Sequence, residues 1–424
     1  DDGKYYILNG DKQFISNGNW ADVFTVLAKV DGDKFSGFIV DRDTEGFEVG
    51  AEEKKMGMKG SSTTPLKFTN AKVPVENLLF KVGKGAAIAF NALNVGRYKL
   101  AAACIGGSKI GIEHAVKYAL ERRQFGQAIA HFDAIKGKIA DMTVRIYAAD
   151  AMLYRTVGLI QDTIDGLDKS DPEYYKKMAE ATERFAIEAS MAKVFGSESS
   201  NLIVDEALQI HGGNGFTEEY PLARAYRDDR INRIWEGTNE INRAIVTGYM
   251  MKKVLMEEIS LRDYLKGVDD FLATESPDIA EDLFQAEKSA LESAKRLASL
   301  VFQEALCEYG QDLKHEQQLS EALADIFTYI YTAGSVISRA RQSQSSNGIS
   351  NMSSVIARIF TAESLLEVKS LSNICLNKIF METIPEDFKD TVIQLESRMT
   401  LNTDTISLKQ SLADFMYTKN NYPF

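Results

Sequence analysis

The hydrophobic pattern of this chain changes its period once, near residue 83, and that change limits the folds open to it. Before this point, runs of β-branched and aromatic residues such as Val23 to Val30 alternate with turn sequences such as Asp31-Gly32-Asp33, a pattern typical of short antiparallel strands. After Lys84 the apolar residues recur at helical spacing. The sequence therefore predicts an α+β protein, mostly α, in which an antiparallel sheet or small barrel precedes helical bundles.

Two further turn sequences divide the β-type part of the chain. Asn9-Gly10 and Asn17-Gly18 are residue pairs that favour tight turns between strands. The strand-like sequence YYILNG follows almost directly after the start of the chain. We therefore expect that the chain begins inside a domain and that N-terminal residues are missing.

The helical part of the chain is interrupted in ways that suggest two domains. Residues 165–179 form a polar connection, and a helix is expected from Lys176 to Ser200. Farther on, Leu283, Ala290 and Leu297 repeat at seven-residue spacing, which indicates an added helical bundle. Breaks in this bundle are expected near Ser276-Pro277, Gln342 to Ser350 and Ile384-Pro385. The predicted domains are a β domain at 1–82, a helical bundle at 83–254 and a C-terminal helical extension at 255–424.

Composition excludes several classes of function. The net charge of −12 and the pI near 5.1 argue against nucleic-acid binding, because phosphate contacts need a basic face. Three scattered cysteines and four histidines suggest neither a disulfide framework nor a metal site, and a reducing compartment fits them best. No apolar run is long enough to span a membrane. The amphipathic C-terminal helices could meet a membrane surface, but packing on their own chain is the preferred interpretation.

Residues 205–243, DEALQIHGGNGFTEEYPLARAYRDDRINRIWEGTNEINR, hold the greatest density of unusual residues in the chain. Gly212, Gly213 and Gly215 end one helical run, so the backbone there can approach a flat or phosphorylated group. Pro221 then opens a short helix. Glycines after a helix are more often simple C-terminal caps, and both interpretations stay open on composition alone.

Glu236 is the candidate catalytic residue of this stretch. Thr238 is predicted to cap the N-terminus of the helix that follows, so Glu236 lies just before a helix start. The positive end of the helix dipole favours a carboxylate at this place. Glu236 could therefore be a catalytic base, or it could be the exposed dipole partner that is more common at such positions.

Two linked motifs, QIHGGNGF at 209–216 and IWEGTNEI at 234–241, resemble the signature of the acyl-CoA dehydrogenase family. Further segments are similar to the same family, so that the resemblance covers residues 3–250: YYILNGDKQFISNG, MGMKGSSTTPLKFTNAKVPVENLL, NVGRYKLAAACIGG and ERRQFGQAIAHFDAIKGKIADM. The resemblance implies flavin-dependent α,β-desaturation of fatty acyl-CoA thioesters, a step of fatty acid β-oxidation, with Glu236 as the base that removes the α-proton. Gly96 stands where the isovaleryl-type branch carries its glutamate, which leaves Glu236 as the candidate base.

The resemblance also implies an FAD cofactor that accepts the β-hydride and is shared between subunits. Ser16 would hydrogen-bond the reactive edge of the flavin, whereas Arg122 would touch the FAD of a neighbouring subunit. An arginine pair on a helix is more often a solvated face. A shared FAD implies a homo-oligomer, with a dimer as the expected form. The implied FAD-binding residues are Phe14, Ile15, Ser16, Arg122, Gln124, Phe125, Phe132, Gln209, Gly213, Thr238 and Glu240.

The acyl-CoA substrate and the electron acceptor follow from the same resemblance. The implied substrate-binding residues are Ser61, Asn94, Arg97 and Gly237. Arg97 would contact the nucleotide end of CoA, and the backbone amide of Glu236 would polarise the thioester carbonyl together with a flavin hydroxyl, so that no metal is required. Electrons would leave to an electron-transferring flavoprotein. The C-terminal extension is similar to that of the very-long-chain branch of the family.

Two alternatives to this function are retained. The first is an acyl-CoA oxidase, whose reduced flavin reacts with oxygen, although oxidase relatives lack the sequence IWEGTNE. The second is a non-catalytic relative that serves as an assembly or scaffold partner through its C-terminal bundle. The expected location is the cytoplasm of a bacterium, or the mitochondrial matrix if the source is eukaryotic.

Overall fold

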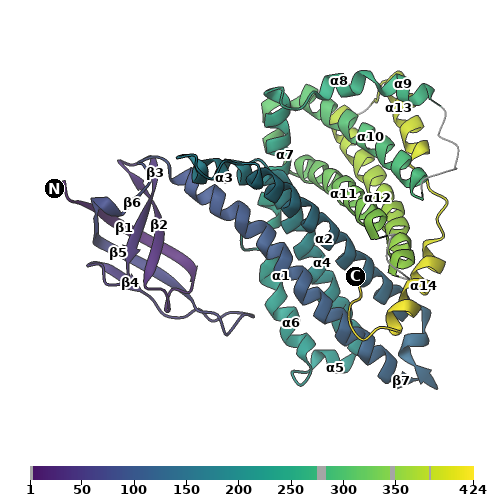
Figure 1. Ribbon diagram of the computed structural model, residues 1–424, viewed down its shortest axis with the longest axis horizontal. Coiled ribbons are helices and arrows are strands. Elements are labelled where there is room, and N and C mark those ends of the chain that lie inside the picture. The colour runs from purple at the N-terminus through teal and green to yellow at the C-terminus, as the bar shows by residue number, and fades with distance from the viewer. Residues whose placement is uncertain (1–2, 275–282, 344–348, 382) are drawn as a thin grey trace. The chain divides into compact units, whose positions relative to one another are not determined.

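The chain forms two compact units in the computed structural model, which describes residues 3–274, 283–343, 349–381 and 383–424 (Figure 1). The β unit spans Asp1–Gly96 and the helical unit spans Arg97–Phe424. Helix α1 (Gly85–Glu121) begins in the β unit and continues into the helical unit. The predicted boundary at residue 82 lies close to the start of α1, whereas the two predicted helical domains form one compact unit.

The β unit contains two three-stranded antiparallel sheets, with strand orders β1-β5-β4 and β2-β3-β6. Their inward-facing residues form one core, in which Phe24 of one sheet packs edge-on against Phe47 of the other at 4.9 Å between ring centroids. The strands are β1 (Tyr5–Ser16), β2 (Val23–Val30), β3 (Lys34–Asp41), β4 (Phe47–Val49), β5 (Thr63–Pro74) and β6 (Leu78–Leu79), with the 3₁₀ turn η1 (Val75–Asn77) before β6. The predicted antiparallel β structure is confirmed.

One predicted turn in the β unit is wrong. Asp31 and Gly32 have positive φ values of 51° and 86° and join β2 to β3, as expected. Asn9-Gly10 lies instead inside the continuous strand β1, where the pairing with β5 shifts register between Leu8 and Gly10. The side chain of Asn9 accepts a hydrogen bond from the backbone N–H of Asn70 on β5 at 2.8 Å. This cross-strand contact accommodates an irregularity that the residue pair alone indicated as a turn.

The helical unit consists of long helices with short connecting elements. The connecting elements are β7 (Arg123–Gln124), β8 (Gln127–Ala128), η2 (Ile129–His131), η3 (Arg230–Arg233) and η4 (Gly310–His315). The helices after α1 are α2 (Asp133–Asp165), α3 (Tyr174–Glu183), α4 (Ala186–His211), α5 (Gly213–Phe216), α6 (Pro221–Asp229), α7 (Asn239–Leu255), α8 (Leu261–Lys266), α9 (Val268–Ala273), α10 (Gln285–Tyr309), α11 (Gln317–Gln342), α12 (Ile349–Phe380), α13 (Glu386–Arg398) and α14 (Thr405–Tyr417).

Local sequence explains where several helices begin, but it does not indicate the break between α3 and α4. Pro221 occupies the first turn of α6, and Pro385 directly precedes α13, because proline suits positions where no intrahelical N–H is needed. The helix expected from Lys176 to Ser200 is wrong, because the chain breaks after α3 and α4 then runs from Ala186 to His211. No proline or glycine marks that break. The break expected near Ser276-Pro277 lies outside the described residues.

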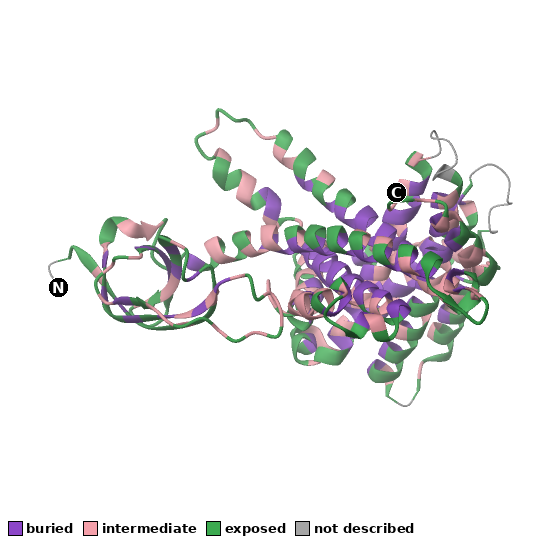
Figure 2. Cartoon of the chain, turned by 90° about the horizontal axis from the view of Figure 1, so that it is seen from below, coloured by how far each residue is buried: buried purple, intermediate pink, exposed green. Residues whose placement is uncertain are grey.

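The C-terminal helices share a core with the helices that precede them. One hydrophobic cluster combines buried residues of α1, α2 and α4 with residues of α11, α12 and α14, and Figure 2 shows the buried residues gathered where these helices pack together. Phe195 on α4 meets Phe360 on α12 edge-on at 5.9 Å. A second cluster joins α10, α11, α12 and α13. The helical unit is therefore held together by α10, α11 and α12, which contribute to both clusters.

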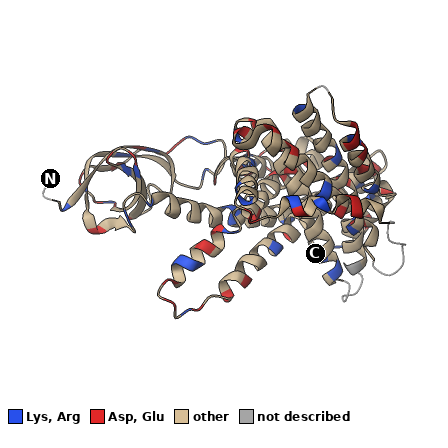
Figure 3. Cartoon of the chain, turned by 90° about the horizontal axis from the view of Figure 1, so that it is seen from above, with Lys and Arg blue, Asp and Glu red and all other residues tan. Residues whose placement is uncertain are grey.

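Acidic and basic residues are interspersed along the helices of the helical unit (Figure 3). Within the described part of the chain, none of the helices combines the length and the apolar character that crossing a membrane requires.

Because the core is shared, we expect the helical unit to unfold in a single transition, also after the contact between Phe195 on α4 and Phe360 on α12 has been removed. Phe360→Ala should lower the free energy of unfolding by about 3–5 kcal/mol, because it removes a buried aromatic ring and leaves a cavity. Chemical denaturation followed by far-UV circular dichroism measures this. Leu366→Ala, on the exposed side of the same helix, is the control and should cost less than about 0.5 kcal/mol. A separate early transition confined to the C-terminal helices would contradict the shared core.

Candidate active site

Glu236 lies in a tight turn between η3 and α7, and its backbone conformation is unusual. Its φ is +57°, and that of Gly237 is +81°. A non-glycine residue in the left-handed region costs free energy and persists only where the surroundings impose it, often at functional sites. A β-carbon at position 237 would come within 3.2 Å of the Asn242 side-chain nitrogen, so glycine suits both the φ value and the space. The turn therefore holds Glu236 in one defined place ahead of α7.

Two side chains hold this turn. Thr238 caps α7, since its hydroxyl oxygen accepts a hydrogen bond from the N–H of Ile241 at 3.4 Å, and this confirms the predicted cap. The buried Asn242 donates from Nδ2 to the carbonyl oxygens of Gly237 at 2.8 Å and Thr238 at 3.0 Å. Asn242 was not identified from the sequence. Its position one turn into a helix whose cap was predicted could have suggested it.

A polar network leads from α4 to the residue before Glu236. Ser200 on α4 donates to the buried Asp229 at 2.6 Å, and Asn232 donates to the same carboxylate at 3.0 Å. The amide oxygen of Asn232 in turn accepts from the indole N–H of Trp235 at 3.1 Å. The backbone on the N-terminal side of Glu236 is therefore fixed through side-chain hydrogen bonds.

A second network anchors the first residue of α7 on α4. The fully buried Lys193 donates from Nζ to the amide oxygen of Asn239 at 2.7 Å. The amide nitrogen of Asn239 donates to Ser197 at 3.1 Å and to Glu198 at 3.0 Å. Burial lowers the pKa of the Lys193 ammonium group to about 8.

Arg243 ties α7 to two other helices at once. Its guanidinium donates two hydrogen bonds to Glu198 on α4, at 2.8 and 3.0 Å, and one to Asp325 on α11 at 2.7 Å. Burial acts to lower the pKa of Arg243, but the hydrogen bonds and charges of the two carboxylates outweigh it and raise that pKa. A helix of the C-terminal extension is thereby attached directly to the helix that Glu236 precedes.

The predicted substrate residues Asn94 and Arg97 lie on α1, one turn apart, and both are buried. Burial lowers the pKa of the Arg97 guanidinium, while electrostatic interactions with Tyr249 and Glu236 act in the opposite direction. Arg97 and Glu236 are thus close enough to interact electrostatically. With 3% of its surface exposed, Arg97 lies inside the protein in this structure.

The sequence after α1 forms a hairpin, so the alternative of an arginine pair on the solvated face of a helix does not hold there. Arg123 and Gln124 of β7 pair with Ala128 and Gln127 of β8. Phe125 and Gly126 at the tip have φ values of 50° and 84°, which suit a tight two-residue turn. Phe-Gly is not one of the residue pairs that usually form such a turn, so the sequence did not indicate this hairpin within a region of helical pattern. Arg122 and Gln124 are exposed, and 92% of Phe125 is exposed.

The turn between α4 and α5 packs against the C-terminal end of α1, the end that is followed by the hairpin. His211 stacks on Tyr118 with 4.1 Å between ring centroids, and Asn214 donates to the Tyr118 hydroxyl at 2.9 Å. Gln209 and Gly213 at this turn are exposed. Phe132 lies edge-on to Phe125 at 6.0 Å.

The structure therefore gathers six of the residues predicted for the cofactor around one end of α1: Arg122, Gln124, Phe125, Phe132, Gln209 and Gly213. Tyr118, His211 and Asn214, which bring the two motifs together, were not identified from the sequence. Glu240 is exposed near the start of α7, and hydrogen bonds from the backbone and from Thr238 lower the pKa of its carboxyl group.

The remaining predicted site residues belong to the β unit. Phe14 has a φ of +57° and is largely exposed, and Ser16 at the end of β1 pairs with Thr63 of β5. The N–H of Asn17 donates to the carbonyl oxygen of Ser62 at 3.1 Å. Ser61 lines an open cleft of about 560 Å³. Residues 14–16 and Ser61 thus lie at the same end of the β unit. In the described ranges of the chain, no group of three or more His, Cys, Asp or Glu side chains could hold a metal ion.

The contacts of Asn242 predict that its loss loosens the turn at Glu236. Asn242→Ala should lower the free energy of unfolding by about 1–3 kcal/mol, because it removes a buried donor that serves two backbone carbonyls. Urea denaturation measures this. Asn373→Ala, which removes an amide donating to Lys369 and Glu396 on the exposed side of α12, is the matched control and should cost less than about 0.5 kcal/mol. Equal losses in the two variants would contradict the account of the turn.

Lys193 predicts a pH dependence of stability with a defined sign. Its pKa is lowered from the ordinary 10.5 to about 8 in the folded chain, so the unfolded chain holds the proton more tightly between these values. Stability therefore rises with pH across this window, by up to about 3 kcal/mol for this group. The difference in unfolding free energy between the wild type and Lys193→Met should shift in favour of the wild type from pH 8 to pH 10.5. A difference that stays constant with pH would be inconsistent with a buried, proton-releasing lysine.

Three family models match the chain. They are the acyl-CoA dehydrogenase middle domain at residues 1–71 and acyl-CoA dehydrogenase C-terminal domains at 83–251 and 293–382. A probable acyl-CoA dehydrogenase of Bacillus subtilis is 44% identical over 371 residues, which cover 87% of this chain and 62% of that protein. The mitochondrial very long-chain specific acyl-CoA dehydrogenase of Rattus norvegicus is 34% identical over 372 residues, which cover 81% of this chain and 54% of that protein.

A solved structure matches the whole chain. It is the crystal structure of an acyl-CoA dehydrogenase complexed with FAD from Bacillus anthracis, 36% identical in sequence, with a TM-score of 0.95 and coverage of 100% of this chain and 72% of that one. The chain spans about three fifths or less of the length of the two curated relatives. It is similar to that crystallised enzyme across its β unit, its helical unit and its C-terminal helices, and it belongs to the acyl-CoA dehydrogenase family.

Proposed function

We propose that the protein desaturates fatty acyl-CoA thioesters between the α- and β-carbons, with FAD as its redox cofactor and Glu236 as its base. The observation that carries this proposal is the conformation of Glu236: its backbone is held at positive φ, with hydrogen bonds on both sides of the turn, directly before a helix in a member of this family. A backbone that is held in place before substrate binds reduces the reorganisation needed to bring the base to its proton.

The residues of the helical unit fit FAD. Arg122 supplies a guanidinium for phosphate, Gln124 and Gln209 supply amides, and Phe125 supplies an exposed aromatic ring. A β-carbon built on Gly213 meets no atom within 4 Å, so a ligand can come close to the backbone there. These features support an FAD held between two copies of the chain, and therefore a homo-oligomer with a dimer as the expected form.

The chemistry divides between the cofactor and the chain. FAD, when bound, supplies the acceptor for the β-hydride. Glu236 takes the α-proton, so that one C–H bond on each carbon is broken, a carbon–carbon double bond forms and Glu236 becomes protonated. Asn242 and Thr238 keep the turn in place during this step. The backbone amide of Glu236, as the family resemblance implies, stabilises the negative charge that develops on the thioester oxygen.

We further propose Ser61, Asn94, Arg97 and Gly237 as contacts to the acyl-CoA. The burial of Arg97 and its electrostatic interaction with Glu236 favour a role close to the reacting end of the site over the contact with the nucleotide end of CoA that the resemblance implied. The C-terminal helices support a preference for long acyl chains, because they match the part of the chain found in the rat very long-chain enzyme. An electron-transferring flavoprotein is the proposed acceptor of the electrons.

The proposal predicts that Glu236→Gln binds FAD but does not reduce it. Anaerobic mixing of the FAD-loaded protein with acyl-CoAs of graded length, followed by flavin absorbance, should show bleaching in the wild type. In Glu236→Gln the rate should fall at least about a hundredfold, since a positioned base contributes on this scale. Glu258→Gln, an exposed glutamate beyond the other end of α7, is the control and should bleach normally.

Two outcomes of this experiment would change the assignment. If no thioester bleaches the wild type, the dehydrogenase function is wrong. If reduction persists in Glu236→Gln, another group is the base. Admitting oxygen after reduction separates the two redox classes, because fast reoxidation without an added acceptor protein favours an oxidase.

A further inference from the structure

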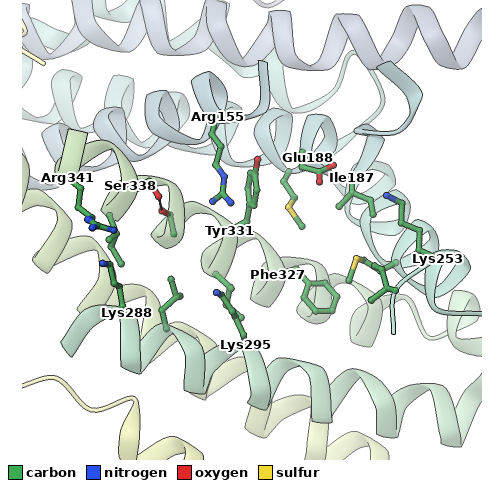
Figure 4. A pocket seen from close by; sticks show the side chains of 17 residues that line it. Arg155, Ile187, Glu188, Lys253, Lys288, Lys295, Phe327, Tyr331, Ser338 and Arg341 are labelled. Carbon is green, nitrogen blue, oxygen red and sulfur yellow. Dashed lines mark hydrogen bonds between the residues drawn. The ribbon is translucent and has the colours of Figure 1, made fainter. Parts of the chain in front are cut away.

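A cleft of about 500 Å³ opens inside the helical unit, away from Glu236 (Figure 4). Five helices line it: α2, α4 and α7 from one side, and α10 and α11 of the C-terminal extension from the other. Met250 and Lys253 represent α7 in its wall. Met250 lies roughly 16 Å along the helix axis from Asn239, the residue where α7 begins. The cleft is therefore separate from the turn that holds Glu236.

The rim of the cleft carries a concentration of positive charge. Its basic side chains are Arg155, Lys253, Lys288, Lys295 and Arg341, and its one acidic side chain is Glu188. Figure 4 shows them arranged along its length, with Arg341 and Lys288 turned toward each other at one end and Lys253 near Glu188 at the other. In a chain with a net charge of −12, such a local excess is not expected from composition. Lys295 is paired with Glu292 beside the cleft at 3.3 Å, so the excess is partly compensated but stays positive. A local positive excess attracts ligands of negative charge.

The walls beneath this rim are apolar. Met191, Leu291, Phe327 and Ile330 contribute hydrophobic side chains from three helices. Arg155 is held over the ring of Tyr331, with 4.7 Å between the guanidinium carbon and the ring centroid. Pockets of a few hundred Å³ with apolar walls and a few placed polar groups are typical of small-molecule sites. A ligand that fits this one needs both a hydrocarbon part and a negative charge.

Gly334 shows that the sequence leaves this space open. It lies in the middle of α11, where glycine costs about 1 kcal/mol relative to alanine. Close packing does not require it, because a β-carbon there would meet Arg155 Nη1 at 3.4 Å and Leu291 Cδ2 at 3.6 Å, which are ordinary contacts. A larger side chain would extend into the cleft. Glycine is therefore present, at a cost to helix stability, at the position where a larger side chain would fill the cavity.

Glu188 also points to a missing partner. Its Oε2 atom is buried and has no hydrogen-bond partner within the described residues. A buried polar atom without a partner costs about 1–3 kcal/mol. Burial raises the pKa of this carboxyl group, and its protonated form could donate a hydrogen bond to an oxygen of a bound anion.

We propose that this cleft is a second ligand site that binds an amphipathic anion: an alkyl chain against the apolar walls, with its carboxylate or phosphate head among the basic side chains. The head can belong to a free long-chain carboxylate or to an acyl-CoA. The site lies between the catalytic helices and the C-terminal extension, so it gives the extension a function of its own. The inference does not depend on the proposed desaturation, because it concerns binding at a place distant from Glu236.

The test is calorimetric titration of the protein with dodecanoate below its micellar concentration. Saturable binding is expected to the wild type, and dodecylamine and inorganic phosphate should each bind at least tenfold more weakly. Dodecanoyl-CoA and free CoA distinguish the two sources of the head group. A dodecanoyl-CoA signal that falls in the cleft variants identifies the thioester as the ligand, and a fall for dodecanoate alone identifies the free carboxylate.

Two variants assign the binding to the cleft. Gly334→Met should weaken dodecanoate binding at least tenfold while keeping or raising the melting temperature, because it fills the cavity and removes a helix glycine. Gly158→Met is its control, since a β-carbon at that helical glycine on α2 meets nothing within 4 Å and the residue does not line the cleft. Arg155→Gln with Lys253→Gln should also weaken binding at least tenfold, whereas Lys117→Gln with Lys169→Gln, both exposed and outside the cleft, should not. Unchanged affinity in Gly334→Met or in the Arg155 and Lys253 variant, or equal binding of dodecylamine, would overturn the proposal.

Discussion

The interaction on which the helical unit most depends is the sharing of the Arg243 guanidinium by Glu198 and Asp325. These three residues come from α7, α4 and α11, so a single charged group joins the helix after Glu236 to its supporting helix and to the C-terminal extension. The attraction is strong enough to raise the pKa of Arg243 against the effect of burial. Losing either carboxylate would leave a partly buried charge without its full compensation. The extension is thus part of the support of the candidate active site.

The turn at Glu236 shows how this support serves chemistry. Positive φ at Glu236 is unfavourable in isolation and is maintained here by Asn242, Thr238 and the capped start of α7. The hydrogen bond from Lys193 to Asn239 then attaches the first residue of α7 to α4. Every hydrogen bond in this set acts on the backbone or on the helix end, and none of them engages the Glu236 carboxylate. The proposed ligand cleft at the far end of the same helix adds a binding role to the extension.

Much of this could be predicted from the sequence, for identifiable reasons. The change of hydrophobic period gave the β and helical parts, and the Thr238 cap follows from side-chain chemistry that acts over three residues. The hairpin at Phe125 and the continuous strand through Asn9 were missed because non-local contacts decided them. The shared core escaped prediction for the same reason: a helical repeat shows that a helix has an apolar face, but it does not show which helix covers that face. Asn242 binds the carbonyl oxygens of Gly237 and Thr238, and His211 stacks on Tyr118. The sequence next to each residue does not indicate these contacts.

The central claim is that Glu236 is the base, and proton exchange tests it apart from any electron transfer. A 3-thia-acyl-CoA carries sulfur in place of the β-carbon and cannot lose a hydride there, yet its α-protons can still be removed and returned. Nuclear magnetic resonance in D₂O can follow deuterium entering the α-position. We expect the FAD-loaded wild type to catalyse this exchange and Glu236→Gln to lose it while keeping bound FAD. Exchange at the wild-type rate in Glu236→Gln would contradict the assignment of Glu236 as the base.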